Sequence, residues 1–451
     1  MAYITFFDYI LLPIYLFFLF YIVKLKAIKY KDTDLYKYFI TGFWIHMAGS
    51  FLYAMVIQYY YGYGDSFGFY QGAQVVRKLV ASNGNPISIF FSSPEGFAKI
   101  YKSSGDENLY MEAGVSNGAS LLVYKITALV SYISFNSYLV ISIFFGLFSF
   151  ASIWRLFCVF RELLQQQFEK KLAYTVLFLP SVCFWGSGLM KDSLCLGLVG
   201  FIFTAGYTLF AQKKFNLKSL IVLIIALYIL FIVKSYIASA LLLAAILTYA
   251  IRIILKSKGN IIKLGFVLLV LVSSVIFLSF SVSSTIESII EESKSQIETF
   301  KNSYESISEN DENSAAGFKD ADFDFTVGGI ILRTPLKVTS TLFRPFIWET
   351  RKPIMFLSAL ESLLMLLAVL YVMIKCRFFR FFYYIAINPE IFFSFVFVIL
   401  LAAIVGFTTF NFGTLVRYRL PIMPFYFFML LSVYKKYQQK SSVDNTIPTI
   451  K

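Results

Sequence analysis

Leu264 to Phe280 reads LGFVLLVLVSSVIFLSF and Phe392 to Phe407 reads FFSFVFVILLAAIVGF, and neither stretch contains a charged residue. The hydrocarbon core of a bilayer is about 30 Å thick, so a helix that crosses it needs roughly 20 apolar residues. Comparable apolar stretches recur along the whole chain. The sequence therefore predicts an all-α fold, that of a polytopic α-helical integral membrane protein.

The composition supports the same class. Hydrophobic residues make up 58% of the chain and charged residues only 15%, and the mean hydropathy is +0.72. This balance excludes an ordinary soluble globular protein. A formal net charge of +14 would favour nucleic acid as the partner of a soluble protein. Here the lysines and arginines lie in short gaps between apolar stretches, so they indicate membrane topology, and no nucleic-acid partner is expected.

Hydropathy predicts about 11 spanning helices, with a range of 10 to 12. The stretch 119–133 is short and is interrupted by Lys125. It is predicted to be an interfacial or re-entrant helix, and the alternative is a twelfth span. The predicted spans are 5–23, 38–60, 136–158, 172–187, 193–211, 219–233, 237–254, 264–283, 353–374, 391–408 and 420–434.

Lysine and arginine gather in every second gap between these spans, and short gaps rich in these residues face the cytoplasm. The basic segments, two of which include the last residues of a predicted span, are 24–37, 155–171, 213–218, 252–263 and 375–380, followed by the tail 435–451. We therefore expect a multi-pass protein of the cell (inner) membrane, with an extracytoplasmic N-terminus and a cytoplasmic C-terminus. The first apolar stretch lacks a basic leader and a small-residue cleavage site, so it is expected to be a retained helix.

This topology leaves two long segments, 61–118 and 284–352, on the outer face. In the second, 284–304 is predicted to be an amphipathic surface helix and 305–324 a polar segment with too little apolar area to order itself. The predicted organisation is a membrane domain at 1–283 that includes loop 61–118, an extracytoplasmic region at 284–352, C-terminal spanning helices at 353–434 and a cytoplasmic tail at 435–451.

The first outer segment opens with YGYGDSFGFY at 61–70, a run rich in glycine and aromatic residues with one carboxylate, Asp65. Aromatic faces such as those of Tyr63 and Tyr70 stack on sugar C–H groups, and a carboxylate can accept the proton of an acceptor hydroxyl. This pattern predicts a sugar site with Asp65 as the catalytic base. The alternative is an aromatic belt at the membrane surface, followed by a turn.

Two cations and a second carboxylate are predicted near the same face. WGSGLMKDS at 185–193 places Lys191 and Asp192 in a tight turn at membrane depth, and Lys234 lies in the short turn between the sixth and seventh spans. Ionisable groups at membrane depth indicate function because their burial is unfavourable. We expect Asp192 to be a second catalytic carboxylate and both lysines to bind phosphate. The alternatives are a capped helical hairpin for the pair and a snorkelling side chain for Lys234.

Two further motifs precede late spans. In LFRPFIWE at 342–349, Arg344 is predicted to bind a phosphate through two guanidinium N–H groups, and Trp348 and Glu349 are predicted to contact a sugar. The alternative is that this segment anchors the chain at the membrane interface. NFGTLVRYRLPIMPF at 411–425 places Arg417 and Arg419 outside, and their alternation in an extended segment puts both on one side, facing an anionic lipid headgroup.

Metal and redox chemistry are not predicted. The four cysteines have no CxxC pair, and His46 is the one histidine. Asp320, Asp322 and Asp324 alternate as in a calcium loop but lack the following glycine, so adventitious binding of a divalent cation is the most that this segment indicates. His46 and Asp8 are expected to serve as hydrogen-bonded packing residues.

The chain resembles the families that handle polyprenyl-linked sugars, namely GT-C type glycosyltransferases and O-antigen or capsule polymerases. The patches similar to GT-C enzymes are 64–70 with Asp65 and 417–424 with its Arg-Tyr-Arg-x-Pro-x-x-Pro order. Two further patches, 344–349 and 187–192, resemble multi-span proteins associated with surface-polysaccharide synthesis. The resemblance implies transfer of sugar units from a polyprenyl-phosphate-linked donor to a glycan acceptor on the extracytoplasmic face. It implies no required cofactor, with a divalent cation left open. The alternative is a flippase or exporter of lipid-linked glycans, in which the charged residues line a translocation path.

Overall fold

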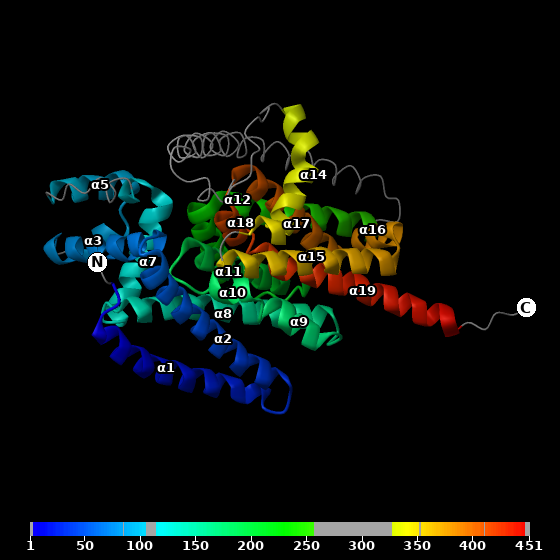
Figure 1. The fold of residues 1–451 in the computed structure, drawn as a ribbon, viewed down its shortest axis with the longest axis horizontal. Helices are drawn as coiled ribbons and strands as arrows, with labels where there is room; N and C mark the ends of the chain where they lie inside the picture. Colours follow the sequence, from blue (N-terminus) through cyan, green and yellow to red (C-terminus); the bar gives the residue numbers. More distant parts are fainter. Residues whose placement is uncertain are drawn as a thin grey trace, which may run out of the picture. The chain divides into compact units, whose positions relative to one another are not determined.

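The computed structural model describes residues 3–83, 85–104, 114–256, 327–350, 353–409 and 411–446. Within these residues the secondary structure consists of helices (Figure 1). Seven of the helices in this part of the chain are long and apolar enough to cross a membrane. They are Phe6–Tyr30, Leu35–Tyr61, Tyr138–Leu163, Lys191–Ala211, Leu217–Lys256, Met355–Cys376 and Pro389–Thr408. The chain is therefore an all-α, multi-pass membrane protein.

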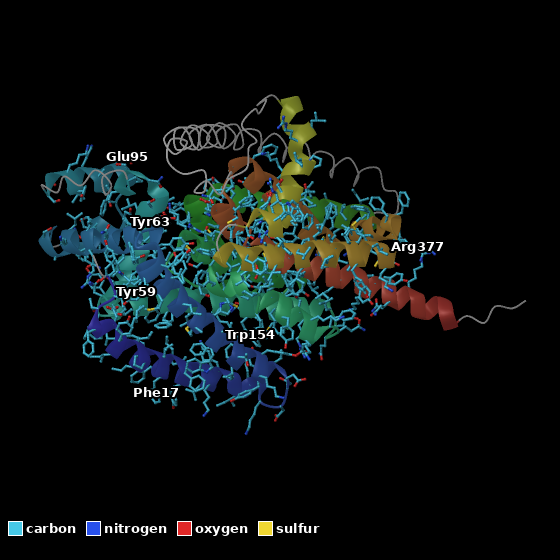
Figure 2. The ribbon with its side chains drawn as sticks, viewed as in Figure 1. Phe17, Tyr59, Tyr63, Glu95, Trp154 and Arg377 are labelled. Atoms are coloured by element: carbon cyan, nitrogen blue, oxygen red, sulfur yellow. The ribbon has the colours of Figure 1, made fainter. Side chains whose placement is uncertain are left out.

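Exposed apolar side chains show which surface faces lipid. On α1 (Phe6–Ala27), Phe6 is 81% exposed and Phe17 is 68% exposed. Figure 2 shows Phe17 at the outer side of this helix. Such a surface would be unfavourable in water but is neutral against lipid tails, which are as apolar as the side chains themselves. The exposed face of α1 is consistent with the bilayer environment.

The described residues fall into two compact units. The first comprises Met1–Val159 and Ala173–Ser235, and the second comprises Phe160–Leu172 and Tyr236–Lys451. In the first unit α3 packs along α7, and α2 packs on α1 and α10 (Figure 1). The helices of this unit, some of which extend past its bounds, are α1, α2 (Leu35–Met55), α3 (Asp65–Asn83), α4 (Pro86–Phe90), α5 (Pro94–Ser103), α7 (Gly118–Ile133), α8 (Tyr138–Leu163), α9 (Glu169–Val176), α10 (Pro180–Phe184), α11 (Lys191–Gly206) and the first part of α12 (Leu217–Lys256).

In the second unit α17 packs against α14 and α19, and α15 packs against α14 and α19. This unit contains the rest of α12 and α14 (Val327–Phe343), α15 (Pro353–Cys376), α16 (Phe378–Ile387), α17 (Pro389–Thr408), α18 (Phe412–Tyr418) and α19 (Ile422–Thr446). α19 extends beyond the predicted span 420–434 into the segment predicted to be the cytoplasmic tail. Lys435 of this segment is buried and donates to Gln165 Oε1 at 3.0 Å.

The predicted span 172–187 is wrong as a continuous helix. The chain instead forms α9 and the short α10, and Leu179 between them has the extended values φ −62° and ψ 126°. Pro180 explains the break, because the residue before a proline is disfavoured in the helical region and proline has no N–H to donate. The backbone from 185 to 190 is irregular and largely buried.

Side chains of α2 satisfy the carbonyls that this break leaves without helical partners. The His46 ring contacts Leu177 O at 3.2 Å and Ser187 Oγ at 3.0 Å, and Ser50 Oγ donates to Ser187 O at 2.6 Å. Irregular backbone at membrane depth is tolerated where protein groups satisfy it. The packing role predicted for His46 is confirmed.

The predicted spans 219–233 and 237–254 form one 40-residue helical element, α12, in which Lys234 has non-helical φ −150° and ψ 84°. Its 40 residues are about twice the roughly 20 that one spanning helix needs. The two predicted segments therefore meet at Lys234, as expected. The connection is a single residue, whereas the sequence predicted a turn of three.

Other predictions have mixed outcomes. The stretch 119–133 is helical, as α7, and falls short of spanning length. The segment 61–118, predicted to lie on the outer face, contains α3, α4 and α5. The span 264–283, the amphipathic helix 284–304, the polar segment 305–324 and its three alternating aspartates lie outside the described residues.

Asp8 joins α1 to the start of α8. Its Oδ1 accepts from Ser137 Oγ at 2.6 Å and from the Leu139 backbone N–H at 3.2 Å. Its Oδ2 accepts from the backbone N–H and the hydroxyl of Thr5 at 2.9 and 2.7 Å. A carboxylate at a helix N-terminus pairs with N–H groups that have no helical partner. The predicted packing role of Asp8 is confirmed.

Candidate functional site

A buried ion pair forms the centre of the candidate site in the first unit. Asp192 lies in the first turn of α11 and Lys234 at the interruption of α12. The Lys234 Nζ donates to Asp192 Oδ1 at 2.6 Å, and their side chains are only 9% and 2% exposed. Two charges removed from water are tolerated together because each neutralises the other, and the N-terminus of a helix favours a carboxylate.

Lys191 is next to Asp192 in sequence but has different partners. Its half-buried ammonium donates to Ser120 Oγ at 3.0 Å and lies 5.7 Å from the centroid of the Phe69 ring. Lys191 also experiences the charges of Asp65, Asp192 and Lys234. Among the residues that the structure describes, it forms no contact ion pair.

Asp65 is the exposed carboxylate of this group and begins α3. The chain reaches it through Gly62 and Gly64, whose φ values of 71° and 144° lie in the region that favours glycine. These glycines allow the chain to turn out of α2, which ends in the π-helix Val56–Tyr61, and to start α3 at once. π-Helical turns are rare and often occur at functional sites.

The two predicted sugar-binding tyrosines have different surroundings. Tyr63, labelled in Figure 2, is 74% exposed. Its ring lies edge-on to that of Tyr61. Tyr70 is half-buried, and its hydroxyl donates to Asn136 O at 2.8 Å. Burial raises the pKa of Tyr70 to about 12. Tyr63 is therefore accessible to a ligand, whereas Tyr70 holds α3 against the α7–α8 connection.

The second unit contains the predicted arginine patch. Arg344 faces Glu349 through Nε, at 3.0 and 3.2 Å from the two carboxylate oxygens, and also through Nη2. Glu349 Oε2 additionally accepts from the Phe346 backbone N–H at 2.8 Å. Trp348 is 81% exposed and stacks on the Phe346 ring at 4.8 Å. The carboxylate of Glu349 is thus engaged by Arg344, and Trp348 presents an open aromatic face.

Arg419 is fully buried and closes the end of α14. Its Nη1 donates to the carbonyl oxygens of Thr341, Leu342 and Arg344, at 3.4, 3.3 and 2.9 Å. Cations at a helix C-terminus pair with carbonyls that have no helical partner. Its Nε and Nη2 have no hydrogen-bond partner among the described residues, and the buried Glu361 exerts an attraction on the guanidinium.

The prediction that Arg417 and Arg419 alternate in an extended segment is wrong. Residues Phe412–Tyr418 form the short helix α18, and Arg419 follows as its C-cap. The Asn411 side chain accepts from the Gly413 backbone N–H at 2.7 Å and starts this helix. Side chains that are two positions apart on a helix point in different directions. Arg417 is accordingly half-buried while Arg419 is enclosed.

The structure thus divides the predicted site residues into two groups. Asp65, Lys191, Asp192 and Lys234 come together in the first unit, while Arg344, Glu349 and Arg419 come together in the second. Sequence reasoning missed Ser120 and Phe69, the two groups that hold Lys191. Ser120 lies in an apolar helix and Phe69 is one of many phenylalanines, so neither residue can be recognised from the sequence as a neighbour of Lys191.

The described residues contain no group of three or more His, Cys, Asp or Glu side chains able to hold a metal ion. The four cysteines lie within the described residues, and none of them forms a disulfide. Comparison with protein-family models, with curated proteins and with solved structures gave no match.

Proposed function

We propose that the protein is a membrane glycosyltransferase or polysaccharide polymerase that transfers sugar units from a polyprenyl-phosphate-linked donor on the extracytoplasmic face. The supporting observation is that an exposed carboxylate, Asp65, acts electrostatically on Lys191, a cation that no carboxylate contacts among the described residues. A base for the acceptor and a cation for the donor are the two groups that such a transfer needs.

In the proposed reaction, an acceptor hydroxyl attacks the anomeric carbon of the donor sugar. Asp65 takes the hydroxyl proton as the new glycosidic bond forms. The bond between the anomeric carbon and the phosphate oxygen breaks, and its electron pair leaves with the lipid phosphate. Lys191 stabilises the negative charge on the departing phosphate, and the exposed ring of Tyr63 stacks on a sugar.

The pair formed by Asp192 and Lys234 supports this site without taking part in proton transfer. A carboxylate in contact with a lysine ammonium and almost wholly buried is a poor base for a substrate that arrives from outside. Arg344 and Arg417 are proposed to bind a phosphate group in the second unit, whereas the fully buried Arg419 holds the end of α14. Arg344 and Arg417 are both half-buried.

A second candidate function is a flippase or exporter of lipid-linked glycans. The observation that favours it is the broken segment 177–190, which combines short helices with buried irregular backbone. Discontinuous helices of this kind form substrate sites in many transporters. In that case the charges of the first unit would bind the glycan phosphate during transit and no bond would be made or broken.

The test is an analysis of surface glycans and lipid-linked intermediates in cells that lack the protein. The cells are complemented with the wild type, with Asp65→Asn, or with Glu95→Gln as a matched change of an exposed carboxylate on α5. The proposal expects lipid-linked units to accumulate outside, with rescue by the wild type and Glu95→Gln but not by Asp65→Asn. Accumulation inside would favour the flippase, and unchanged glycans and lipids would exclude both.

A further inference from the structure

The two lysines of the candidate site differ in what surrounds their charge. Lys234 is in contact with a carboxylate, so its charge is neutralised within the protein. Lys191 is held by a neutral hydroxyl and lies near an aromatic ring. An ammonium group has three hydrogen-bond donors, and the structure uses one of them at Ser120. The positive charge of Lys191 and two of its three N–H donors therefore remain for a ligand.

The groups that hold Lys191 are themselves fixed. Ser120 lies in the first turn of α7, and its backbone N–H donates to Asn117 Oδ1, the side chain that caps the helix, at 3.1 Å. Phe69 on α3 is only 6% exposed, and its ring lies 6.1 Å from that of Tyr124 on α7. Gly72 brings the two helices together, since a Cβ at this position would overlap the Tyr124 ring.

Contact with Ser120 and Phe69 restricts the orientation of the Lys191 side chain. A lysine side chain is flexible and loses much rotamer freedom when it is fixed. The Ser120 hydroxyl and the face of the Phe69 ring restrict the ammonium before any ligand arrives, so less entropy is lost on binding. Pre-organised charge of this kind stabilises an anion better than a mobile charge does.

We propose that Ser120 and Phe69 are positioning residues that orient the Lys191 ammonium toward the phosphate group of a ligand. The Asp192 and Lys234 pair fixes the first turn of α11, from which Lys191 projects. The identity of the ligand as a lipid-linked donor rests on the proposed function. The orientation of Lys191 by its two neighbours does not.

The first experiment measures the reactivity of Lys191 in the purified full-length protein in detergent micelles. The protein is acylated with the N-hydroxysuccinimide ester of acetic acid, and the rate at Lys191 is followed by mass spectrometry. Ser120→Ala and Phe69→Leu are expected to change this rate by at least about threefold, because a hydrogen bond or a ring contact to the amine is lost. Ser120→Thr, which keeps the hydroxyl, should restore the wild-type rate.

The matched control is Ser131→Ala on the same helix, where the hydroxyl donates to the local Ala128 carbonyl at 2.7 Å. This variant should leave the Lys191 rate unchanged. Equal rates at Lys191 in the wild type, Ser120→Ala and Phe69→Leu would overturn the proposal. Acylation at Lys125 reports in every sample whether α7 is still folded.

The second experiment adds an anion before acylation. A short-chain polyprenyl phosphate and inorganic phosphate are compared as protectors of Lys191, in the wild type and in Ser120→Ala. Protection by either one that weakens in Ser120→Ala supports the positioning role, and the comparison tells a lipid headgroup from a free phosphate. Protection by neither would overturn the phosphate-directed role.

A transfer assay separates this inference from the proposed function. Ser120→Ala should raise the KM for the lipid-linked donor and lower kcat, because Lys191 contacts the phosphate both before and during its departure, and Ser120→Thr should restore both values. A wild-type protein without transfer activity would remove the proposed function, while the acylation rates would still decide whether Ser120 and Phe69 orient Lys191. An active Ser120→Ala variant with the wild-type KM would count against the positioning role.

Discussion

Lys234 Nζ lies 2.6 Å from Asp192 Oδ1, and both side chains are more than nine-tenths buried. This contact joins the start of α11 to the interruption of α12, two elements that are far apart in sequence. Its burial distinguishes it from the pair between Arg252 and Glu390, whose side chains are 27% and 33% exposed. Burial, not distance, decides how strongly the protein depends on each pair.

Removing one partner of the buried pair should therefore destabilise the protein strongly. Asp192→Asn or Lys234→Met leaves a buried charge without its counter-ion, a change that typically costs about 3–5 kcal/mol. The double variant removes both charges and should recover much of this loss. Thermal unfolding in detergent measures the effect.

Arg252→Met is the matched control for this prediction. It also breaks an ion pair with the same N–O distance, but exposed pairs contribute only about 0–1 kcal/mol. A double variant no more stable than the two single variants would show that the two charges are not coupled.

Arg419 and Arg417 should respond differently to substitution. Arg419→Lys keeps a charge but loses the guanidinium whose Nη1 donates to three carbonyls at the end of α14, so less folded protein is expected. Arg417→Ala should leave the yield of folded protein unchanged and, if the proposed phosphate role holds, abolish product. Size-exclusion yield and the glycan assay measure the two effects. Full activity of Arg417→Ala would remove this residue from the phosphate site.

The membrane class and most helix positions could be predicted from sequence because hydropathy acts over whole segments. The structure has helices at nearly all predicted spans that fall within its described residues. Local chemistry explains the exceptions. Pro180 interrupts a stretch that is apolar enough to span, and hydropathy does not register the missing N–H.

The site was less predictable because its contacts are between residues distant in sequence. Charge at membrane depth identified Lys191, Asp192 and Lys234, but pairing Asp192 with Lys234 rather than Lys191 requires the fold. Arg419 was assigned from its charge alone. Its contacts with α14 carbonyls show a structural role that a one-dimensional pattern cannot contain.

Asp8 should contribute stability and not chemistry. Asp8→Asn replaces one acceptor oxygen with an amide that must face the Ser137 and Leu139 donors or the Thr5 donors. The loss of buried hydrogen bonds to a charged acceptor should destabilise the protein by about 1–3 kcal/mol. Thermal unfolding measures this loss, and Asp34→Asn, which changes an exposed carboxylate, is the control. Equal melting temperatures for both variants would contradict the role of Asp8 as a cap of α8.

Lys125 should give the protein a pH-dependent stability. Its buried ammonium on α7 donates to the carbonyl and hydroxyl oxygens of Ser92, at 2.8 and 3.2 Å, and lies 5.5 Å from the Phe97 ring centroid. Burial lowers the pKa of Lys125 to about 8. This helix is too short to belong to the spanning set.

The lowered pKa fixes the sign of the effect. Between about pH 8 and about pH 10, the unfolded chain keeps the Lys125 proton while the folded chain releases it, so the unfolded state binds more protons. The free energy of unfolding must then rise with pH, by at most about 1.4 kcal/mol per pH unit for one proton. Below about pH 8 the lysine is charged in both states, and the destabilisation from its burial is present in full.

The measurement is the melting temperature between about pH 7 and about pH 9.5, compared between the wild type and Lys125→Met. The wild type should gain stability relative to the variant as the pH rises, because only the wild type can release this proton on folding. Lys78→Met removes an exposed lysine of α3 and keeps Lys125, so it should retain the wild-type slope. A constant difference between the wild type and Lys125→Met across this range would show that Lys125 stays charged in the folded protein, and that its contacts with Ser92 and Phe97 compensate for its burial.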